Sequence, residues 1–567
     1  GQVLVETTLL WSYVLEMMPK LQMPGFQLLL LSLHLMDVRG HQFLRNVRLT
    51  TDNGEIIGRR VMTDEDKIID QYSSIPYAVP PIGEMRFKAP RPIDPWTKPL
   101  DVSSFPLACT QIKAPTFHGV LNEDTMGENC LYLSVYTPVS QKGPHPVVVW
   151  VHGGGFIGGQ MSEETNLPEN LVGSYNVIAV AIQYRLGSLG FLYLGDEEAP
   201  GNMALLDQQL ALHWVRDNIE TFGGDPYRIT LMGESAGSGS VNYHLLSPGS
   251  RALFSQLITM SGATLSNWAY SDPHKLVSRT RDLLSALSCD KQSVSESMAC
   301  MRGLRALDIV KAEQAMPNIT GPRFTPTNDG HFITHPPHYI LDNHLFYGVP
   351  VLGGVTHDEG DFFLEKVAPQ LIQASPPNMT NEEFLLYFQR MAGNRRQPVM
   401  KQVLEAYHRY LFEETGLEAT PFNILRTLLG DVRIVCDVMF TMSKYADQSP
   451  EQTFMYVLNY KVSGLNQPSW RGVTHAVDLP LVFGHHPDHN KCLSTQDQLI
   501  RSRLMTYWTN FIKTGNPNCG DEGNCVRDTW ISMGSGDRRT YLLINDEPRW
   551  GHAYDFHKRL CESANPK

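Results

Sequence analysis

The sequence predicts an α/β protein, with a central, mostly parallel β-sheet flanked by helices in a single large domain. Three observations lead to this class. Residues 147–151 form a continuous apolar, β-branched run, which is typical of a buried parallel strand. Residues 202–219 have the periodicity of an amphipathic helix, and a second apolar run follows at 229–232. Each apolar run leads directly into a glycine-rich segment, as in α/β enzymes whose sites lie at strand ends.

The segment that follows the predicted helix indicates a sharp return of the chain. Phe222-Gly223-Gly224 is a helix C-cap signal, and Asp225-Pro226 predicts a turn before the strand 229–232. That strand leads into G-E-S-A-G at 233–237, and a helix is expected after it. This order predicts a nucleophile elbow with Ser235 exposed at its tip, because glycines at both flanks let the backbone pack closely. Ser235 is therefore the candidate nucleophile.

A second glycine-rich segment, H-G-G-G at 152–155, follows the strand 147–151. Taken alone, a glycine triplet favours a flexible turn. Directly after a buried strand and upstream of an elbow, it predicts an oxyanion hole made of backbone N–H groups. The candidate donors are Gly154, Gly155 and Ala236.

These segments, together with others along the chain, resemble the type-B carboxylesterase and cholinesterase family of α/β-hydrolases. The resemblance extends from Asn46 to about Cys561. Its motifs are IPYAVPPIGEMRFKAP (75–90), ENCLYLSVYTP (128–138), HGGGF (152–156), QYRLGSLGFL (183–192), GNMALLDQQLALHWVRDNIETFGGDP (201–226), GESAG (233–237), GVTHDEGDFF (354–363) and WTNFIKTGNPN (508–518). The resemblance implies an α/β-hydrolase fold and hydrolysis of carboxylic esters, with no cofactor and no metal.

The remaining members of a catalytic triad are expected downstream of the nucleophile, acid first and histidine second. The apolar run 349–355 predicts a strand that ends at an Asp-Glu pair. The family pattern implies that Glu359 is the acid, and its neighbour Asp358 is the alternative. His475 lies in G-V-T-H-A-V-D after the predicted strand 454–458, so the resemblance implies that it is the base.

In this chemistry His475 takes a proton from Ser235 and returns it to the leaving alcohol, while Glu359 orients the imidazole. Ser261, which follows the predicted strand 257–260, is expected behind the triad as a supporting group.

Three further histidines, His485, His486 and His489, form a cluster that raises the alternative of a metal site. The cluster has no cysteine or carboxylate framework of a known ligand spacing. A polar loop is the expected structure.

The composition is that of an acidic protein, with a formal net charge of -12 and no basic stripe. This argues against nucleic acid as a partner and gives no reason to expect an anionic membrane. The expected partner is a small-molecule ester substrate, for a monomer or homodimer without a membrane anchor. Residues 41–567 are expected to form the domain, because no linker or repeat divides them.

The N-terminal residues predict a targeting segment rather than part of the fold. Residues 1–17 are expected to be an unstructured extension. Residues 18–40 resemble a secretory signal peptide, because Lys20 precedes an eleven-residue apolar stretch at 26–36. A short buried helix is the alternative for that stretch. The prediction is therefore a secreted, extracellular protein.

The nine cysteines fit an oxidising compartment. The resemblance implies the pairs Cys109–Cys130 and Cys289–Cys300. Cys436 with Cys561 resembles the long-range bridge of cholinesterases. Cys519 and Cys525 could close a small surface loop, which leaves Cys492 for a free thiol or an intermolecular bridge. Two sequons, at Asn318 and Asn378, are glycosylation acceptors if the chain is secreted.

The resemblance further implies two buried structural ion pairs, Arg86–Glu128 and Arg185–Asp207.

Departures from the cholinesterases bear on the substrate. The segment 109–130 contains no Trp, the residue over which cholinesterases bind a quaternary ammonium. Phe362 and Phe363 match an aromatic pair of that subgroup and predict a gorge wall, with core packing as the alternative. Glu234 before the nucleophile argues against a juvenile hormone esterase. The chain looks most like the insect general carboxylesterases, which implies short to medium acyl esters of uncharged alcohols, such as odorant, pheromone, hormone or xenobiotic esters.

Two other classes remain as alternatives. Neuroligin-like adhesion proteins share this fold and have lost the nucleophile, whereas this chain retains Ser235, Glu359 and His475. A lipase acting on aggregated lipid would need an exposed amphipathic lid, and no segment predicts one.

Overall fold

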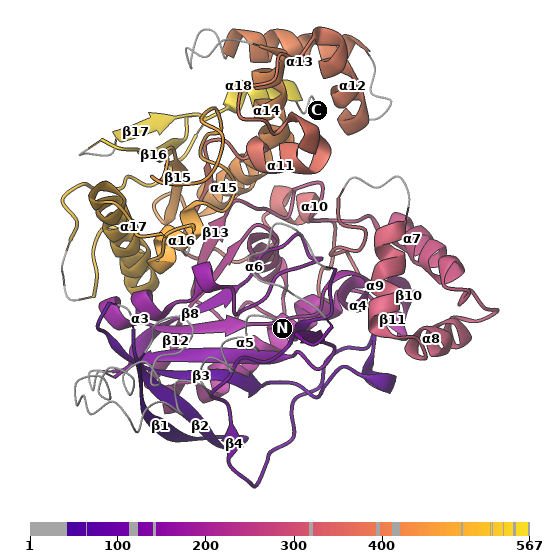
Figure 1. The fold of residues 1–567 in the computed structure, drawn as a ribbon, viewed down its shortest axis with the longest axis vertical. Coiled ribbons are helices and arrows are strands. Elements are labelled where there is room, and N and C mark those ends of the chain that lie inside the picture. Colours follow the sequence, from indigo (N-terminus) through magenta and orange to yellow (C-terminus); the bar gives the residue numbers. More distant parts are fainter. Residues whose placement is uncertain are drawn as a thin grey trace, which may run out of the picture.

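The computed structural model describes residues 42–63, 65–112, 123–139, 143–316, 321–392, 397–410, 420–488, 491–521, 523, 525–536, 538–547 and 551–564. These residues form one sheet of 13 strands, covered by helices on both faces (Figure 1). In sheet order the strands are β1 (Gln42–Thr51), β2 (Gly54–Met62), β3 (Ile68–Pro76), β7 (Tyr132–Pro138), β9 (Ile178–Ile182), β8 (His145–Val151), β12 (Gly224–Glu234), β13 (Gln256–Met260), β14 (Val351–Thr356), β15 (Thr453–Leu458), β16 (Thr540–Ile544) and β17 (Gly551–Tyr554), with β4 (Leu100–Asp101) paired to β2.

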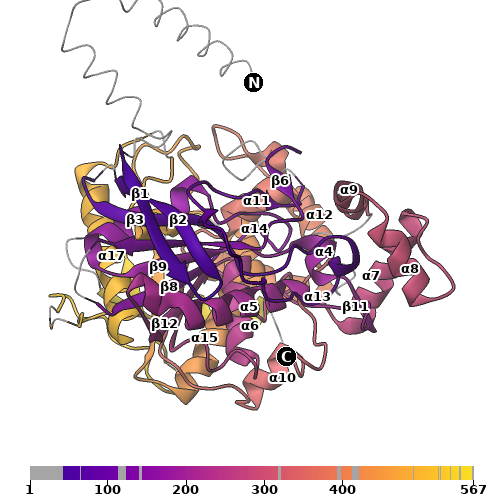
Figure 2. The same cartoon turned by 90° about the horizontal axis from the view of Figure 1, so that it is seen from below.

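The middle of the sheet is parallel and its two edges are antiparallel. Every neighbouring pair from β9 to β16 is parallel, whereas the strands from β1 to β9 and the pair β16–β17 are antiparallel. Figure 2 shows β1, β2 and β3 at one edge, beside β8, β9 and β12. In register, Val151 lies opposite Gly233, and Glu234 lies opposite Met260. The loops that follow β8, β12 and β13 therefore leave the same edge of the sheet. This arrangement confirms the predicted mostly parallel sheet.

The helices are α3 (Glu169–Tyr175), α4 (Gly187–Phe191), α5 (Met203–Asn218), α6 (Ala236–Leu246), α7 (Pro273–Ala286), α8 (Val294–Arg302), α9 (Ala306–Ala315), α10 (Pro337–Asp342), α11 (Gly360–Val367), α12 (Asn381–Ala392), α13 (Gln397–Tyr410), α14 (Pro421–Gly430), α15 (Cys436–Gln448), α16 (Asp478–Phe483), α17 (Thr495–Thr514) and α18 (Lys558–Ala564). A π-helical turn, η7 (Asp431–Val435), joins α14 to α15. Two small ribbons pair β5 (Ala108–Cys109) with β6 (Met126–Gly127) and β10 (Tyr193–Asp196) with β11 (Ala199–Pro200).

The core has two layers because alternate side chains of a strand point to opposite faces of the sheet. Along β8, Val149 packs in the layer that contains residues of α5 and α6, whereas Val148 and Trp150 pack in the layer that contains residues of α16 and α17. Burial of both faces explains why the parallel strands are apolar throughout.

A third, smaller core lies among α11, α12, α13, α14 and α18, which gather at the top of Figure 1. It includes Leu364 of α11, Leu425 of α14 and Leu560 of α18. Since α11 begins shortly after β14 ends, this helical cluster lies at the carboxyl end of that strand.

The predicted elements agree with the observed ones within a few residues. The helix expected at 202–219 is α5, and a 3₁₀ turn (Ile219–Phe222) follows it, ended by Gly223 at φ 84°. The strand expected at 229–232 is longer, because β12 also includes the turn residues from Gly224 onward. There the pairing with β8 is irregular, between Gly224 and Ile229.

Four disulfides are present among the described residues, three with pairs that the resemblance implied and one that closes the small loop considered for Cys519 and Cys525. They are Cys109–Cys130, Cys289–Cys300, Cys436–Cys561 and Cys519–Cys525, and Cys492 is an exposed free thiol. Buried cations and carboxylates also pair as expected: Arg86 Nε lies 2.6 Å from Glu128 Oε1, and Arg185 Nη2 lies 2.6 Å from Asp207 Oδ1.

Some predictions concern segments that the structure does not describe. The extension at 1–17, the signal peptide at 18–40 and the sequon at Asn318 lie outside the described residues. The second sequon asparagine, Asn378, is exposed just before α12. Within the described part of the chain, no helix combines the length and the apolar character needed to cross a membrane.

Candidate active site

Ser235 lies at a sharp turn between β12 and α6, in the conformation φ 55°, ψ -119°. Non-glycine residues rarely adopt this positive φ, so the local backbone is strained. Packing enforces the turn: a Cβ on Gly233 would lie 2.3 Å from the Gly237 carbonyl, and one on Gly237 would lie 2.0 Å from the Val151 oxygen. Ser235 is half-buried, whereas the other four residues of G-E-S-A-G are buried. The turn therefore presents the Ser235 side chain, as the sequence predicted.

The glycine loop after β8 packs directly on this elbow. A Cβ on Gly153 would lie 2.7 Å from Glu234 Oε2 and 3.2 Å from the Ser235 Cβ, so only glycine fits there. Gly154 and Gly155 both have positive φ, at 109° and 62°. The loop therefore lies beside the elbow and the N-terminus of α6, where free N–H groups favour negative charge.

The predicted acid and base are hydrogen-bonded to each other. His475 Nδ1 lies 2.6 Å from Glu359 Oε2, and both side chains are buried. The second oxygen of Glu359, Oε1, accepts hydrogen bonds from Ser261 Oγ at 2.6 Å and from the Thr356 N–H at 2.9 Å. Ser261 therefore has the supporting position expected of it. With both oxygens engaged, the carboxylate holds one orientation of the imidazole ring.

The other ring nitrogen of His475 faces the elbow. Nε2 lies 3.0 Å from Oε1 of Glu234, the residue that precedes Ser235. Burial alone would lower the pKa of His475, but the carboxylates of Glu234 and Glu359 outweigh it and raise that pKa. Burial also raises the pKa of Glu234, and the charge of His475 opposes this. Each of the two groups therefore affects the other's titration.

Two aromatic rings line the side of His475. The ring centroid of Phe362 lies 4.9 Å from that of His475, and the centroid of Phe363 lies 6.0 Å away. One turn further along α11, Lys366 Nζ lies 5.1 Å from the Phe362 centroid. The aromatic pair thus forms a wall beside the base, and a cationic side chain lies at its outer end.

Asp358, the alternative candidate for the acid, is bonded to neighbouring loops. Its Oδ2 accepts a hydrogen bond from the Val473 N–H at 2.9 Å and lies 3.2 Å from His357 Nδ1. Arg426 Nη2 lies 3.6 Å from Oδ1. Burial would raise the pKa of Asp358, but His357 and Arg426 outweigh it and lower that pKa to about 2. The partners of Asp358 are therefore Val473, His357 and Arg426 rather than His475.

Sequence reasoning missed two residues of this region, Asp361 and Arg426. Arg426 Nε lies 2.5 Å from Asp361 Oδ1, and Asp361 Oδ2 accepts from the Gly472 N–H at 2.9 Å. The close acidic spacing D-E-G-D at 358–361 is the one signal that could have pointed to a cation nearby. Nothing in the sequence around Arg426 identifies it as that cation.

The two described histidines of the cluster, His485 and His486, bond to backbone carbonyls, as expected for a polar loop. His485 Nε2 lies 2.8 Å from the Leu167 carbonyl, and His486 Nε2 lies 2.9 Å from the Ser463 carbonyl. His489 lies outside the described residues. Over the ranges that the structure describes, no group of three or more His, Cys, Asp or Glu side chains is arranged to hold a metal ion.

The chain is similar to known proteins over most of its length. The carboxylesterase family matches residues 45–560. Acetylcholinesterase of Bungarus fasciatus is 33% identical over 512 residues, which cover 88% of this chain and 83% of the relative. Since the family match extends over nearly the whole described fold, the chain belongs to the carboxylesterase family and is a carboxylic ester hydrolase.

Proposed function

We propose that the protein is a secreted serine carboxylesterase that acts through an acyl-enzyme, with Ser235 as nucleophile, His475 as general base and Glu359 as the orienting acid. One observation carries the proposal. A strained elbow presents Ser235, and Glu359 holds the imidazole of His475 at 2.6 Å while Nε2 of that ring lies 3.0 Å from Glu234, the residue that precedes Ser235.

The geometry supports a two-stage reaction. Ser235 Oγ attacks the ester carbonyl and passes its proton to His475 Nε2, while Glu359 stabilises the imidazolium that forms. N–H groups of Gly154, Gly155 and Ala236 stabilise the negative oxygen of the tetrahedral intermediate. His475 then gives the proton to the leaving alcohol. Water repeats the cycle on the acyl-enzyme and releases the acid, so the reaction needs no cofactor.

The proposed substrates are short to medium acyl esters of uncharged alcohols. The wall of Phe362 and Phe363 offers apolar area, worth about 25 cal/mol per Å² buried. The segment 109–130 has no Trp for a cation, and Lys366 adds positive charge at the Phe362 ring. A choline group would therefore meet repulsion where a neutral alcohol would not.

Secretion is supported by the four disulfides and by the exposed sequon at Asn378. Disulfides of this number persist in oxidising compartments. N-glycosylation at Asn378 in a secreted preparation, detected by mass spectrometry of the peptide, would agree with this part of the proposal. A cytosolic protein with reduced cysteines would contradict it.

The direct test is the nucleophile. Ser235→Ala should lower kcat by about 10⁴-fold or more, as loss of a triad nucleophile does. An organophosphate should label Ser235 stoichiometrically, as read by mass spectrometry, and Ser104→Ala, at an exposed serine, should leave labelling and turnover unchanged. Full activity of Ser235→Ala would refute the assignment.

A wild-type chain that binds but does not turn over a panel of p-nitrophenyl esters would favour the neuroligin-like binding module instead.

A further inference from the structure

We infer that Arg426, through Asp361 and Asp358, is a positioning residue that fixes the loop carrying His475 against the turn carrying Glu359. The inference rests on the proposed function, because it concerns how the proposed base and acid are kept in register. The two residues come from separate segments more than a hundred positions apart, so their 2.6 Å contact needs a device that holds the segments together.

The first part of this device is a bidentate ion pair. Arg426, in α14, donates from Nε to Asp361 Oδ1 at 2.5 Å and from Nη2 to Asp361 Oδ2 at 2.8 Å. The Asp361 side chain is 1% exposed and that of Arg426 is 11% exposed. Charge-assisted bonds in this fork geometry are directional, so the carboxylate cannot rotate freely. Its Oδ2 also accepts from the Gly472 N–H, which lies in the loop before His475.

The second part joins the same loop to Asp358. The Asp358 N–H donates to the Val473 carbonyl and Asp358 Oδ2 accepts from the Val473 N–H, both at 2.9 Å. A Cβ on Gly472 would lie 2.0 Å from Asp358 Oδ2, so the approach requires glycine. Carboxylates on both sides of Glu359 therefore hold successive backbone N–H groups of the loop that carries His475.

Arg426 is the cation that makes this arrangement favourable. Asp358, Glu359 and Asp361 lie within four residues of each other, and like charges at this spacing repel. Arg426 lies 3.6 Å from Asp358 as well as contacting Asp361, and among the described side chains His357 is the other basic group at Asp358. Loss of the Arg426 charge would leave the buried carboxylate of Asp361 without its cation, which favours movement of the turn.

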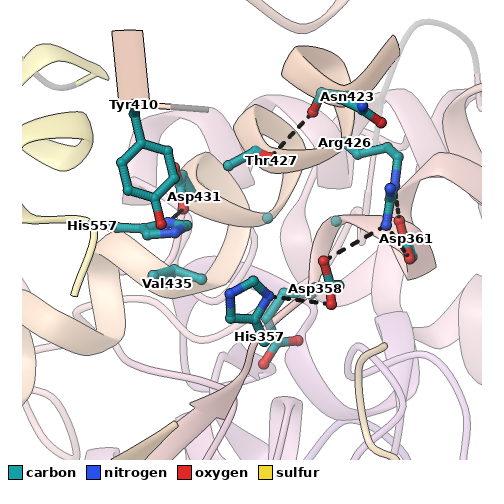
Figure 3. A pocket seen from close by; sticks show the side chains of 13 residues that line it. His357, Asp358, Asp361, Tyr410, Asn423, Arg426, Thr427, Asp431, Val435 and His557 are labelled. Carbon is teal, nitrogen blue, oxygen red and sulfur yellow. Dashed lines mark hydrogen bonds and ion pairs between the residues drawn. The ribbon is translucent and has the colours of Figure 1, made fainter. Parts of the chain in front are cut away.

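The surroundings leave room for that movement. Figure 3 shows Arg426 reaching toward Asp361 and Asp358 beside a small cavity of about 30 Å³. Across the cavity, His557 Nδ1 lies 2.6 Å from Asp431 Oδ1, and Tyr410 is nearby. Because this space can hold water, the turn is fixed by its polar contacts rather than by close packing on that side.

The test compares Arg426→Met with a matched ion pair outside the site. Arg60 in β2 makes the same bidentate pair with Asp70 in β3, at 2.6 and 2.7 Å. Arg426→Met should lower kcat by about 10- to 100-fold with little change in KM, because a shift of about 1 Å at a base costs on this scale. Arg60→Met should leave kcat, KM and the pH profile as in the wild type.

The pH profile separates positioning from general destabilisation. His475 faces Glu359, Glu234 and Asp478, which all raise its pKa. If the loop moves away from Glu359, the acid limb of the kcat/KM profile should shift to lower pH in Arg426→Met and not in Arg60→Met. Arg426→Lys should recover part of kcat. The isosteric variant Asp361→Asn keeps an acceptor for Gly472 and should show a smaller change in the same direction, so it decides the matter if Arg426→Met does not fold.

The outcomes distinguish this inference from the proposed function. If Ser235→Ala is inactive and Arg426→Met and Asp361→Asn both match Arg60→Met in kcat and in pH profile, the positioning role is wrong and the esterase mechanism stands. If Ser235→Ala retains full activity, the mechanism itself fails. A double variant Arg426→Met, Asp361→Asn that loses no more than Arg426→Met alone would show that the two residues act as one unit.

Discussion

His475 and Glu234 form a buried pair in which Nε2 and Oε1 are 3.0 Å apart, directly beside the proposed nucleophile. The base therefore lies between two carboxylates, because Glu359 contacts its other nitrogen. Both carboxylates favour the protonated imidazole, whereas the proposed attack needs the neutral form. The acid limb of the activity profile should report this balance.

Glu234→Gln should shift that limb. The substitution removes a negative charge and nearly preserves the side-chain shape, so the pKa of His475 should fall. Since a base must be deprotonated, the lower pKa moves the acid limb of kcat/KM to lower pH. The measurement is the pH profile for a neutral p-nitrophenyl ester. An unchanged limb, or a shift to higher pH, would show that Glu234 does not set the titration of the base.

Glu359→Gln and Asp358→Asn should rank the two neighbouring acids. Glu359→Gln leaves His475 Nδ1 without its carboxylate and should lower kcat by about 10⁴-fold, as in other triads. Asp358→Asn keeps an oxygen acceptor for the Val473 N–H and should cost less than about tenfold by the same scale. The kcat of each variant at its pH optimum is the measurement, and the opposite ranking would make Asp358 the acid.

Lys366 is expected to disfavour ester substrates whose alcohol group carries a positive charge. Wild-type kcat/KM should favour a neutral ester over a choline ester of the same acyl group. Lys366→Gln should raise the relative value for the choline ester about two- to fivefold, since a cation at the Phe362 ring is worth roughly 0.5–1 kcal/mol. The neutral ester measured with the same variant is the control. A wild-type preference for the choline ester would place the protein with the cholinesterases.

The buried pair Arg185–Asp207 should matter for stability rather than for chemistry. Asp207→Ala leaves a guanidinium buried without its partner, which costs about 3–5 kcal/mol of unfolding free energy. Glu55→Ala breaks the exposed pair with Arg48 and should cost about 0–1 kcal/mol. Denaturant midpoints, compared between the two variants, test this. Equal shifts would show that burial of the Arg185 pair has no special cost.

Much of the fold could be predicted because its signals are local. Buried parallel strands are apolar throughout, so β8, β12, β14 and β15 are visible as short runs, and the glycine segments after β8 and β12 predict where they end. Ser235 could be placed for the same reason: its turn needs Gly233 and Gly237 at fixed spacing. The proposed acid and base, Glu359 and His475, needed the family resemblance, since neither lies in a segment with a distinctive local pattern.

The tertiary structure decided which distant groups meet. The strand order places β12, β13 and β14 side by side, and this brings Ser261 to Glu359 and the Glu359 turn to the elbow. Arg426 reaches the acid turn because Gly360 lets α11 approach α14, where a Cβ would lie 1.8 Å from the Arg426 carbonyl. The contact of Glu234 with His475 likewise depends on the packing of a long loop. The sequence by itself therefore determined the strands, the elbow and the candidate nucleophile Ser235, because these follow from local periodicity and turn chemistry, whereas Glu359 and His475 were named by the family resemblance. The contacts of Glu234, Asp361 and Arg426 around the site were decided by the tertiary structure alone, because contacts between segments far apart in the chain leave no local signal.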